Sequence, residues 1–433
     1  MKRIILIVAV CVGCAGKIYA DDATNAWPSL TLADAQQLAL QNHPQIAAAN
    51  YRVLAAREAV KQARAGYFPN ANAYIDGVAT GEEGTRILAG GLNNPSVYDR
   101  DAGGLAVSQL ITDFGHTANL TASSKFQAQA ENENASATRE DVLLRVQVGY
   151  FSALEAQAVL SVAQKTFDTR QLLADQVTLL ASNKLKSELD VSFARVALEE
   201  GRLLLQRAQN DASAAMASLS TTLGYHESRT FQLVEQSPTD FSITNDVFKL
   251  VETALARRPE LLSLRAEHES ALHYAKSQRD SRLPVISAVG VMGDAPSHDS
   301  HVPDHYAAGG IQLSLPLFAG GLYTARQHEA EYRAQSDDEL LRAAEDDIVR
   351  DVHIGWLNVN NALEELHTTE QLVKNASEAY DLAQARYQIG SSSIVELSQA
   401  QLSLTSAQIA DTNARYNVLI QQANLNHDTG VLR

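Results

Sequence analysis

The sequence predicts a mainly α-helical chain made of two copies of one unit, each with long helical hairpins and a pair of β-strands. Three observations support this fold class. All ten prolines among the 433 residues lie outside two stretches, 115–237 and 317–433, so long helices can run there unbroken. Motifs recur at a fixed spacing over nearly the whole chain. Between the helical stretches, apolar and polar residues alternate with the period of a strand.

The first twenty residues (1–20) are expected to form a secretory signal peptide. They contain Lys2 and Arg3, an apolar run too short to span a membrane, and a possible cleavage site after Ala20. Both cysteines lie in this leader, and Cys14 is alternatively the acceptor of a lipid anchor. No later apolar segment reaches about 18 residues, the length of a transmembrane helix. An exported chain of this kind can enter a membrane only as strands.

An internal duplication covers nearly the whole mature chain. Residues 38–46 (LALQNHPQI) return as 253–261 (TALARRPEL) at an offset of 215, and from Gly103-Gly104 onward the offset is 206. A length difference confined to one place marks a surface loop. We therefore expect a first repeat at 21–224, a connector at 225–245 and a second repeat at 246–433.

Each repeat is expected to begin with one helix, capped at Thr31 or Asp246 and ending before Pro69 or Pro284. A β-hairpin follows, in which apolar residues occupy every second position. A soluble hairpin packed on helices is one interpretation, and a pair of membrane strands is the other. The two hairpins are expected at about 69–114 and 284–320, with polar loops at 81–102 and 295–307. The outward, lipid-facing side would carry Leu105, Val107, Ile111, Ile311, Leu313, Leu315 and Leu317.

Long helices are expected at 115–224 and 321–430, where Ala, Leu, Gln, Glu and Arg are frequent. An unbroken helix from Gly115 to about residue 181 would be about 100 Å long. Helices of this length that turn back near 183 and near 390 form antiparallel coiled-coil hairpins. Four strands per chain cannot close a barrel, since the smallest single-chain barrels have eight. Membrane strands would therefore require several chains to pool their strands, because an open sheet edge cannot lie in lipid.

Several short motifs resemble the TolC family of outer-membrane efflux channels. They are 42–44 (NHP), 257–259 (RRP), the strand exits 108–115 (SQLITDFG) and 314–321 (SLPLFAGG), and 414–417 (ARYN). The resemblance spans about residues 30–430. It implies a homotrimer whose twelve strands close one barrel in the lipid of the outer membrane, in a Gram-negative type envelope. The helices would continue this barrel as a tapering tunnel through the periplasm.

The resemblance also implies a periplasmic aperture, held shut by acidic residues and their hydrogen-bond partners. The matching positions are Asp190, Tyr387 and Glu396, with Ser392 where the best-known members have a basic residue and Gln399 where they have a second acid. Rings of Asp190 and Glu396 around a narrow, water-filled throat would favour cations. Alternatively, these acids only solvate a coiled-coil turn.

The hairpin tips are the expected docking surface for a periplasmic adaptor protein. Asn183 and Gly390 can take the left-handed conformation that such a turn requires, and Lys184 stands at the place that matches the glycine. These three residues are therefore the candidate docking positions.

No motif for catalysis or for a cofactor is visible. The sequence lacks a phosphate-binding loop, a nucleophile elbow and a paired-carboxylate cleft. His268 and His273 are five residues apart, whereas the zinc-protease motif needs four. His298, His301 and His305 in the second loop could bind a metal ion, although a polar exposed loop explains them equally well. The 51 acidic and 35 basic residues, a net charge of −16, argue against a nucleic-acid partner.

The expected function is that of a passive exit duct for small molecules such as drugs, toxic compounds or metal ions. Its partners would be an adaptor protein and an inner-membrane pump of the resistance-nodulation-division, ABC or major-facilitator type, which supplies the energy. An outer-membrane component of type I protein secretion is an alternative. A periplasmic coiled-coil structural or adhesion protein is an alternative of another class.

Overall fold

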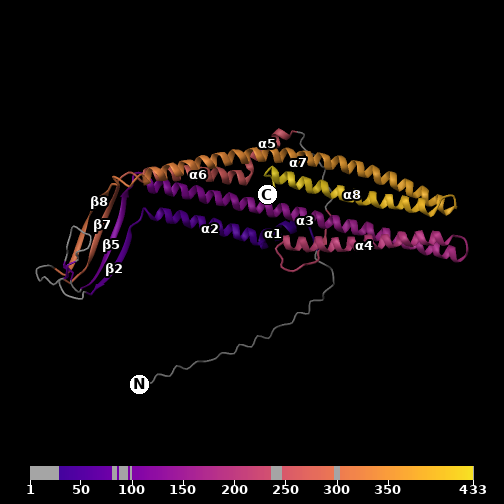
Figure 1. Cartoon of the computed structure of the whole chain (residues 1–433), viewed down its shortest axis with the longest axis horizontal. Helices are drawn as coiled ribbons and strands as arrows, with labels where there is room; N and C mark the ends of the chain where they lie inside the picture. Colours follow the sequence, from indigo (N-terminus) through magenta and orange to yellow (C-terminus); the bar gives the residue numbers. More distant parts are fainter. Residues whose placement is uncertain are drawn as a thin grey trace, which may run out of the picture.

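The computed structural model describes residues 29–79, 85–86, 96–97, 100–235, 246–296 and 303–432. The expected signal peptide, Cys14, His298 and His301 lie outside these residues. The described chain is elongated, with a β-sheet at one end and the turns of two long helical hairpins at the other (Figure 1). Within the described part, no helix combines the length and the apolar character that a membrane span requires.

The helices of the two halves have the same lengths in the same order. Each half has helices of 11, 22, 67 and 35 residues. The starts of the two short helices are related by the offset of 215 and those of the two long helices by the offset of 206, as the motifs are. The helices are α1 (Leu32–Asn42), α2 (Pro44–Ala65), α3 (His116–Ser182), α4 (Glu188–Thr222), α5 (Val247–Arg257), α6 (Pro259–Asp280), α7 (Leu322–Gln388) and α8 (Ile394–Asp428).

Both 67-residue helices begin directly after a glycine in the left-handed region. Gly115 has a φ of 117° and Gly321 a φ of 84°. At such angles a side chain would be strained, so glycine is the residue best suited to the sharp turn that starts each long helix. This requirement explains why both strand-exit motifs end in glycine.

The expected first helix of each half is divided into two helices at a proline. The residues before Pro44 and Pro259, His43 and Arg258, have ψ values of 123° and are therefore extended. A proline ring disfavours the helical conformation of the residue before it, so α1 ends at Asn42 and α2 begins anew. The prediction of a single helix was wrong here.

Four strands form one antiparallel sheet in the order β2-β5-β7-β8. The pairing of β5 with β7 joins the hairpin of the first half to that of the second, and β2 and β8 are the edges. A two-residue ladder, β3 with β4, lies in the expected first loop, and β5 begins inside that loop. The strands are β1 (Ser29–Leu30), β2 (Asn70–Val78), β3 (Thr85–Arg86), β4 (Ser96–Val97), β5 (Arg100–Thr112), β6 (Gln232–Leu233), β7 (Val285–Asp294) and β8 (His305–Ser314).

The apolar strand positions are exposed in the single chain. The seven expected lipid-facing residues are between 41% and 87% exposed. Two of them, Leu315 and Leu317, lie beyond the end of β8 at Ser314, in the connection to α7. The predicted second strand was therefore too long, because it continued past Ser314, where β8 ends, and across Pro316.

The helices pack around the long pair α3 and α7. α3 contacts α2, α4, α6 and α8, and α7 contacts α5, α6 and α8. In the core near α1, the buried Tyr150 hydroxyl lies 2.8 Å from the carbonyl oxygens of Leu30 and Val234. It thereby ties α3 to the two-residue parallel ribbon of β1 and β6, which holds the start of the described chain against the connector.

Candidate functional site

The two hairpin turns lie at the end of the molecule opposite the sheet (Figure 1). We call the turn between α3 and α4 (183–187) the first tip and the turn between α7 and α8 (389–393) the second tip. A buried apolar cluster joins the helices behind both tips. It consists of Ala174, Val177, Val191, Ala194, Ala383, Tyr387, Ile394 and Leu397. The two tips are therefore parts of one packed unit.

Each tip turns through one residue in the left-handed conformation. In the second tip this residue is Gly390, with a φ of 74°, as expected. In the first tip it is Lys184, with a φ of 61°, whereas Asn183 has a φ of −91°. The expectation for Asn183 was wrong. The turn geometry follows the repeat, and Lys184 takes the conformation of the glycine that it replaces.

Asp190 caps the helix that follows the first tip. Its Oδ2 atom accepts hydrogen bonds from the Ser187 hydroxyl at 2.8 Å and from the Ser187 amide at 3.0 Å. The Ser187 hydroxyl in turn accepts from the Asp190 amide at 3.2 Å, which completes a capping box. These bonds from Ser187 lower the pKa of Asp190, so its carboxylate is charged at neutral pH.

Glu396 is held by two side chains of the second tip. Arg386 Nη1 donates to its Oε1 atom, and Ser392 Oγ donates to its Oε2 atom, both at 2.8 Å. Ser392, which was named with Glu396 as an aperture candidate, therefore forms a hydrogen bond with it. Gln399 lies on α8, about one turn beyond Glu396.

The sequence reasoning missed Arg386. This residue is the third from the end of α7, and Glu396 is the third residue of α8. Opposite charges at equal distances from a hairpin turn were the signal that could have identified the pair. At the offset of 206 the first repeat has Leu180, so only the second tip contains such a pair.

Tyr387 connects the second tip to the first. Its side chain is 8% exposed, and its hydroxyl has no hydrogen-bond partner among the described residues. Lys186 Nζ lies 4.2 Å from the centre of its ring, a cation–π contact between the two tips. Burial and the charge of Asp190 raise the pKa of Tyr387, so the phenol is neutral.

A cavity of about 570 Å³ opens between the two hairpins behind the tips. Its lining comes from both hairpins and contains apolar and polar side chains. It includes Leu172, Leu180, Leu185, Tyr380, Tyr387 and Ile389, with Lys186 and Gly390 beside the tips. The candidate docking positions Lys184 and Gly390 therefore lie at or next to a concave surface.

The histidines considered for metal binding have other neighbours. His268 makes a hydrogen bond with the Ala334 carbonyl, and His273 with the Asn119 side chain. The Nδ1 atom of His305, the one loop histidine in the described part, lies 3.4 Å from Asp294 Oδ1 across the β7–β8 hairpin. None of these contacts brings the expected histidines together.

The comparisons with known proteins agree with this architecture. The family model described as Outer membrane efflux protein matches residues 35–225 and 250–431. Outer membrane protein TolC of Escherichia coli is 27% identical over 357 residues, which cover 77% of this chain and 72% of TolC. Alkaline protease secretion protein AprF of Pseudomonas aeruginosa is 25% identical over 93% of this chain and 85% of its own length.

A solved structure shows the same fold at lower sequence identity. The Campylobacter jejuni CmeC outer membrane channel superposes with a TM-score of 0.78 at 16% identity, over 92% of this chain and 85% of that one. The family match includes both repeats and all four long helices. The chain therefore belongs to the family of outer membrane efflux proteins, that of the TolC-type channels.

Proposed function

We propose that three copies of this chain form one passive exit duct, with a twelve-stranded barrel in the outer membrane and a helical tunnel in the periplasm. The duct would export small molecules that an inner-membrane pump and a periplasmic adaptor deliver to it. Family membership supports efflux as the activity and the outer membrane as the location. The number of chains, the barrel and the partners are our inference.

The sheet carries this proposal. Its edge strands β2 and β8 each pair on one side only within the described chain. Their free amides and carbonyls would have no partners in lipid, so strands from other chains must satisfy them if the sheet is in a membrane. Four strands are too few to close a barrel, and three copies supply twelve. The exposed apolar residues on β5 and β8 would then face lipid.

The helices support the tunnel. A helix of 67 residues is about 100 Å long, far deeper than one globular core. We propose that the two tips form the periplasmic aperture, with Asp190, Tyr387, Ser392, Glu396 and Gln399 around it. We further propose that the surface around Asn183, Lys184 and Gly390, with the cavity behind it, docks the adaptor.

Fractionation of cells that produce the full chain tests the proposal. We expect a trimer in outer-membrane extracts that resists detergent and dissociates on heating. A deletion strain should become more sensitive to toxic small molecules and recover when the gene is restored. Release of the protein by osmotic shock as a soluble species would contradict the duct and favour the periplasmic structural or adhesion protein.

A type I secretion exit is the second candidate, supported by the similarity to AprF, a protease secretion protein by name. Deletion of this chain would then abolish secretion of a protein and leave resistance to small molecules unchanged. Measuring both phenotypes in the same deletion strain separates the two candidates.

A further inference from the structure

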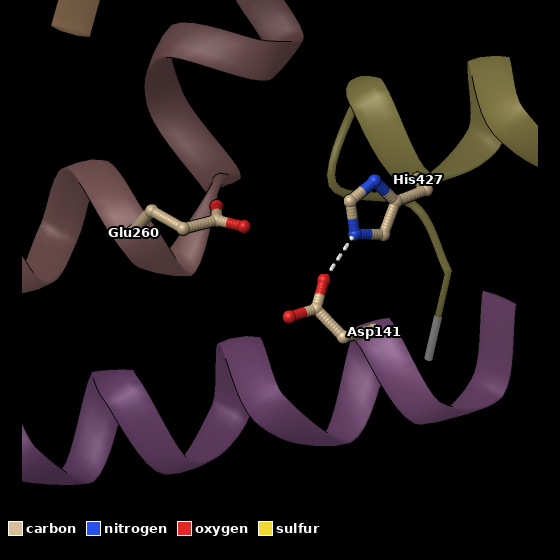
Figure 2. A group of neighbouring side chains, drawn as sticks. All are labelled: Asp141, Glu260 and His427. Carbon is tan, nitrogen blue, oxygen red and sulfur yellow. Dashed lines mark hydrogen bonds and ion pairs between the residues drawn. The ribbon is translucent and has the colours of Figure 1, made fainter. Parts of the chain in front are cut away.

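We propose that Asp141, Glu260 and His427 form a binding site for one divalent transition-metal ion of the zinc type. The three residues come from α3, α6 and α8, and their ligand atoms all lie within 4.8 Å of one another. Figure 2 shows that the three side chains point toward a common space between the helices. Imidazole nitrogen and carboxylate oxygen are both ligand types that bind zinc in proteins.

The distances fit a zinc ion after a small adjustment of the side chains. His427 Nε2 lies 3.0 Å from Asp141 Oδ1. With bonds of about 2.0–2.1 Å, the ligands of a tetrahedral zinc ion lie roughly 3.3 Å apart. The imidazole and the Asp141 carboxylate therefore already stand near the required separation. Rotation of the longer Glu260 side chain would bring in the third ligand.

The second ring nitrogen of His427 has a partner that orients the ring. His427 Nδ1 lies 3.6 Å from Asp428 Oδ1, while the His427 side chain is only 12% exposed. In zinc sites the nitrogen that does not bind the metal commonly faces a carboxylate, which fixes the ring and increases its basicity. Asp428 therefore leaves Nε2 as the nitrogen directed at Asp141 and Glu260.

Two arginines near the cluster do not block it. Arg258 Nε lies 3.3 Å from Glu260 Oε2, which leaves the other carboxylate oxygen available. Arg145 Nη2 donates to the side-chain oxygen of Gln45 on α2. Asp141 and Arg145 also line a cavity of about 520 Å³ between α2 and α3, so this ligand borders an open space.

A proton would compete with the metal at His427. The hydrogen bond to Asp141 and the contact with Asp428 raise the pKa of His427 to about 9. The ring is therefore protonated at neutral pH when no metal is bound, and a bound ion must displace that proton.

The ligand set occurs in one repeat only. With the repeat offsets applied, the counterparts of Asp141, Glu260 and His427 are Asp347, Gln45 and Thr221. Only the aspartate remains, so the duplicated architecture does not itself require a histidine or a glutamate here. Asp347 instead pairs with Arg350 on its own helix and supplies a matched control position.

The test is zinc binding by the purified full-length protein in detergent, without a histidine tag, followed by calorimetry with ZnCl₂. We expect a site with one Zn²⁺ per chain. His427→Gln and Glu260→Gln should each lower its affinity more than tenfold, and Asp428→Asn by about 10–100-fold, the usual effect of losing such an orienting partner. Asp347→Asn should bind zinc as the wild type does.

Cobalt binding provides a measurement that needs no variant. Wild-type protein loaded with Co²⁺ should show the visible absorption of a tetrahedral site with nitrogen and oxygen ligands, and Zn²⁺ should abolish it. The proposal is overturned if the wild type lacks this spectrum and this site. It is also overturned if His427→Gln and Glu260→Gln, assembled as the wild type is, bind zinc as tightly as Asp347→Asn.

Discussion

Glu396 lies at the surface of the second tip, where Arg386 and Ser392 hold its two carboxylate oxygens. Arg386 also brings a positive charge to within 2.8 Å of the acid and so weakens its negative potential. Three such pairs would surround the proposed aperture of a trimer. The cation preference of the duct would therefore depend on both members of the pair.

We predict that Arg386→Ala increases cation preference in planar-bilayer recordings. The substitution removes three positive charges from the throat of a trimer, so the ratio of cation to anion permeability should rise. Arg350→Ala is the control, because Arg350 pairs with Asp347 and Asp351 on α7, far from the tip. An equal change in both variants would contradict a role of Arg386 at the aperture.

Neutralising the acids should have the opposite effect. The double variant Asp190→Asn with Glu396→Gln removes six carboxylates from a trimeric throat, while the amides keep the side-chain shapes. We predict a fall in cation preference, measured as the reversal potential in a salt gradient. Unchanged selectivity would mean that the two acids only solvate the turns.

At the scale of the element, the two tips have the same backbone conformation at equivalent positions but different residues there, Lys184 in the first tip and Gly390 in the second. Lys184 and Gly390 both have positive φ angles, but only glycine adopts them without strain. The left-handed conformation costs another residue about 1–2 kcal/mol, partly offset because glycine loses about 0.5–1 kcal/mol more in chain entropy. A Cβ added at Gly390 would meet no atom within 4 Å. A substitution there therefore changes stability through the backbone conformation and not through a steric clash.

We predict that Lys184→Gly stabilises the first tip by up to about 1 kcal/mol and that Gly390→Ala destabilises the second by a similar amount. Hydrogen exchange of amides in the last turns of α3 and α7 would measure both effects. Asn183→Gly is the control with the opposite sign, since a φ of −91° suits any residue. Glycine there adds chain entropy and loses the hydrogen bond from Asn183 Nδ2 to the Leu179 carbonyl at 2.9 Å. Slower exchange in Asn183→Gly than in Lys184→Gly would refute the assignment.

Much of the fold could be predicted because it depends on long, regular signals. The absence of proline and the two repeat offsets identified the 67-residue helices and both hairpin tips. The break at Pro44 was missed because the apolar spacing of α1 and α2 continues across it. The ribbon of β1 and β6 was missed because two residues carry no periodicity, and its partner is the distant Tyr150.

The residues of the candidate site could be predicted only at positions that match a motif of the TolC family. Asp190, Tyr387 and Glu396 were named from the resemblance, and the structure places them in and behind two adjoining tips. The partners of these residues depend on the geometry of the turns. Arg386, on the helix before the second tip, and Lys186, above the ring of Tyr387, reach their partners only when the hairpins form.

At the scale of the whole molecule, the sheet repeats its register between the two halves. Asn70 lies opposite Ser108 in the first hairpin, and Val285 lies opposite Ser314 in the second, so the pairing obeys both repeat offsets. The pairing of β5 with β7 joins the first half to the second. In a closed ring of equivalent chains, β8 of one chain would pair with β2 of the next, in the same way as β5 pairs with β7 within one chain.

The offsets then specify the register between chains. Val107 lies opposite Gly290 in the β5–β7 pairing, which places Leu313 opposite Ile75 of the partner subunit. Both side chains are exposed in the single chain, at 64% and 91%. Opposite residues of antiparallel strands have Cβ atoms about 4.5–5.5 Å apart, close enough for a disulfide after a small adjustment.

We predict that Leu313→Cys combined with Ile75→Cys gives a covalent trimer on oxidation, measured by non-reducing electrophoresis after heating. Both natural cysteines lie within the first twenty residues, so the introduced pair would have no competitor in a chain from which the expected leader is cleaved. Leu313→Cys with Tyr74→Cys is the matched control, because the neighbouring residue points to the other face of the strand. Equal cross-linking of both pairs would refute this register. A wild-type-like trimer that cross-links in neither would place the chain boundary elsewhere than between β8 and β2.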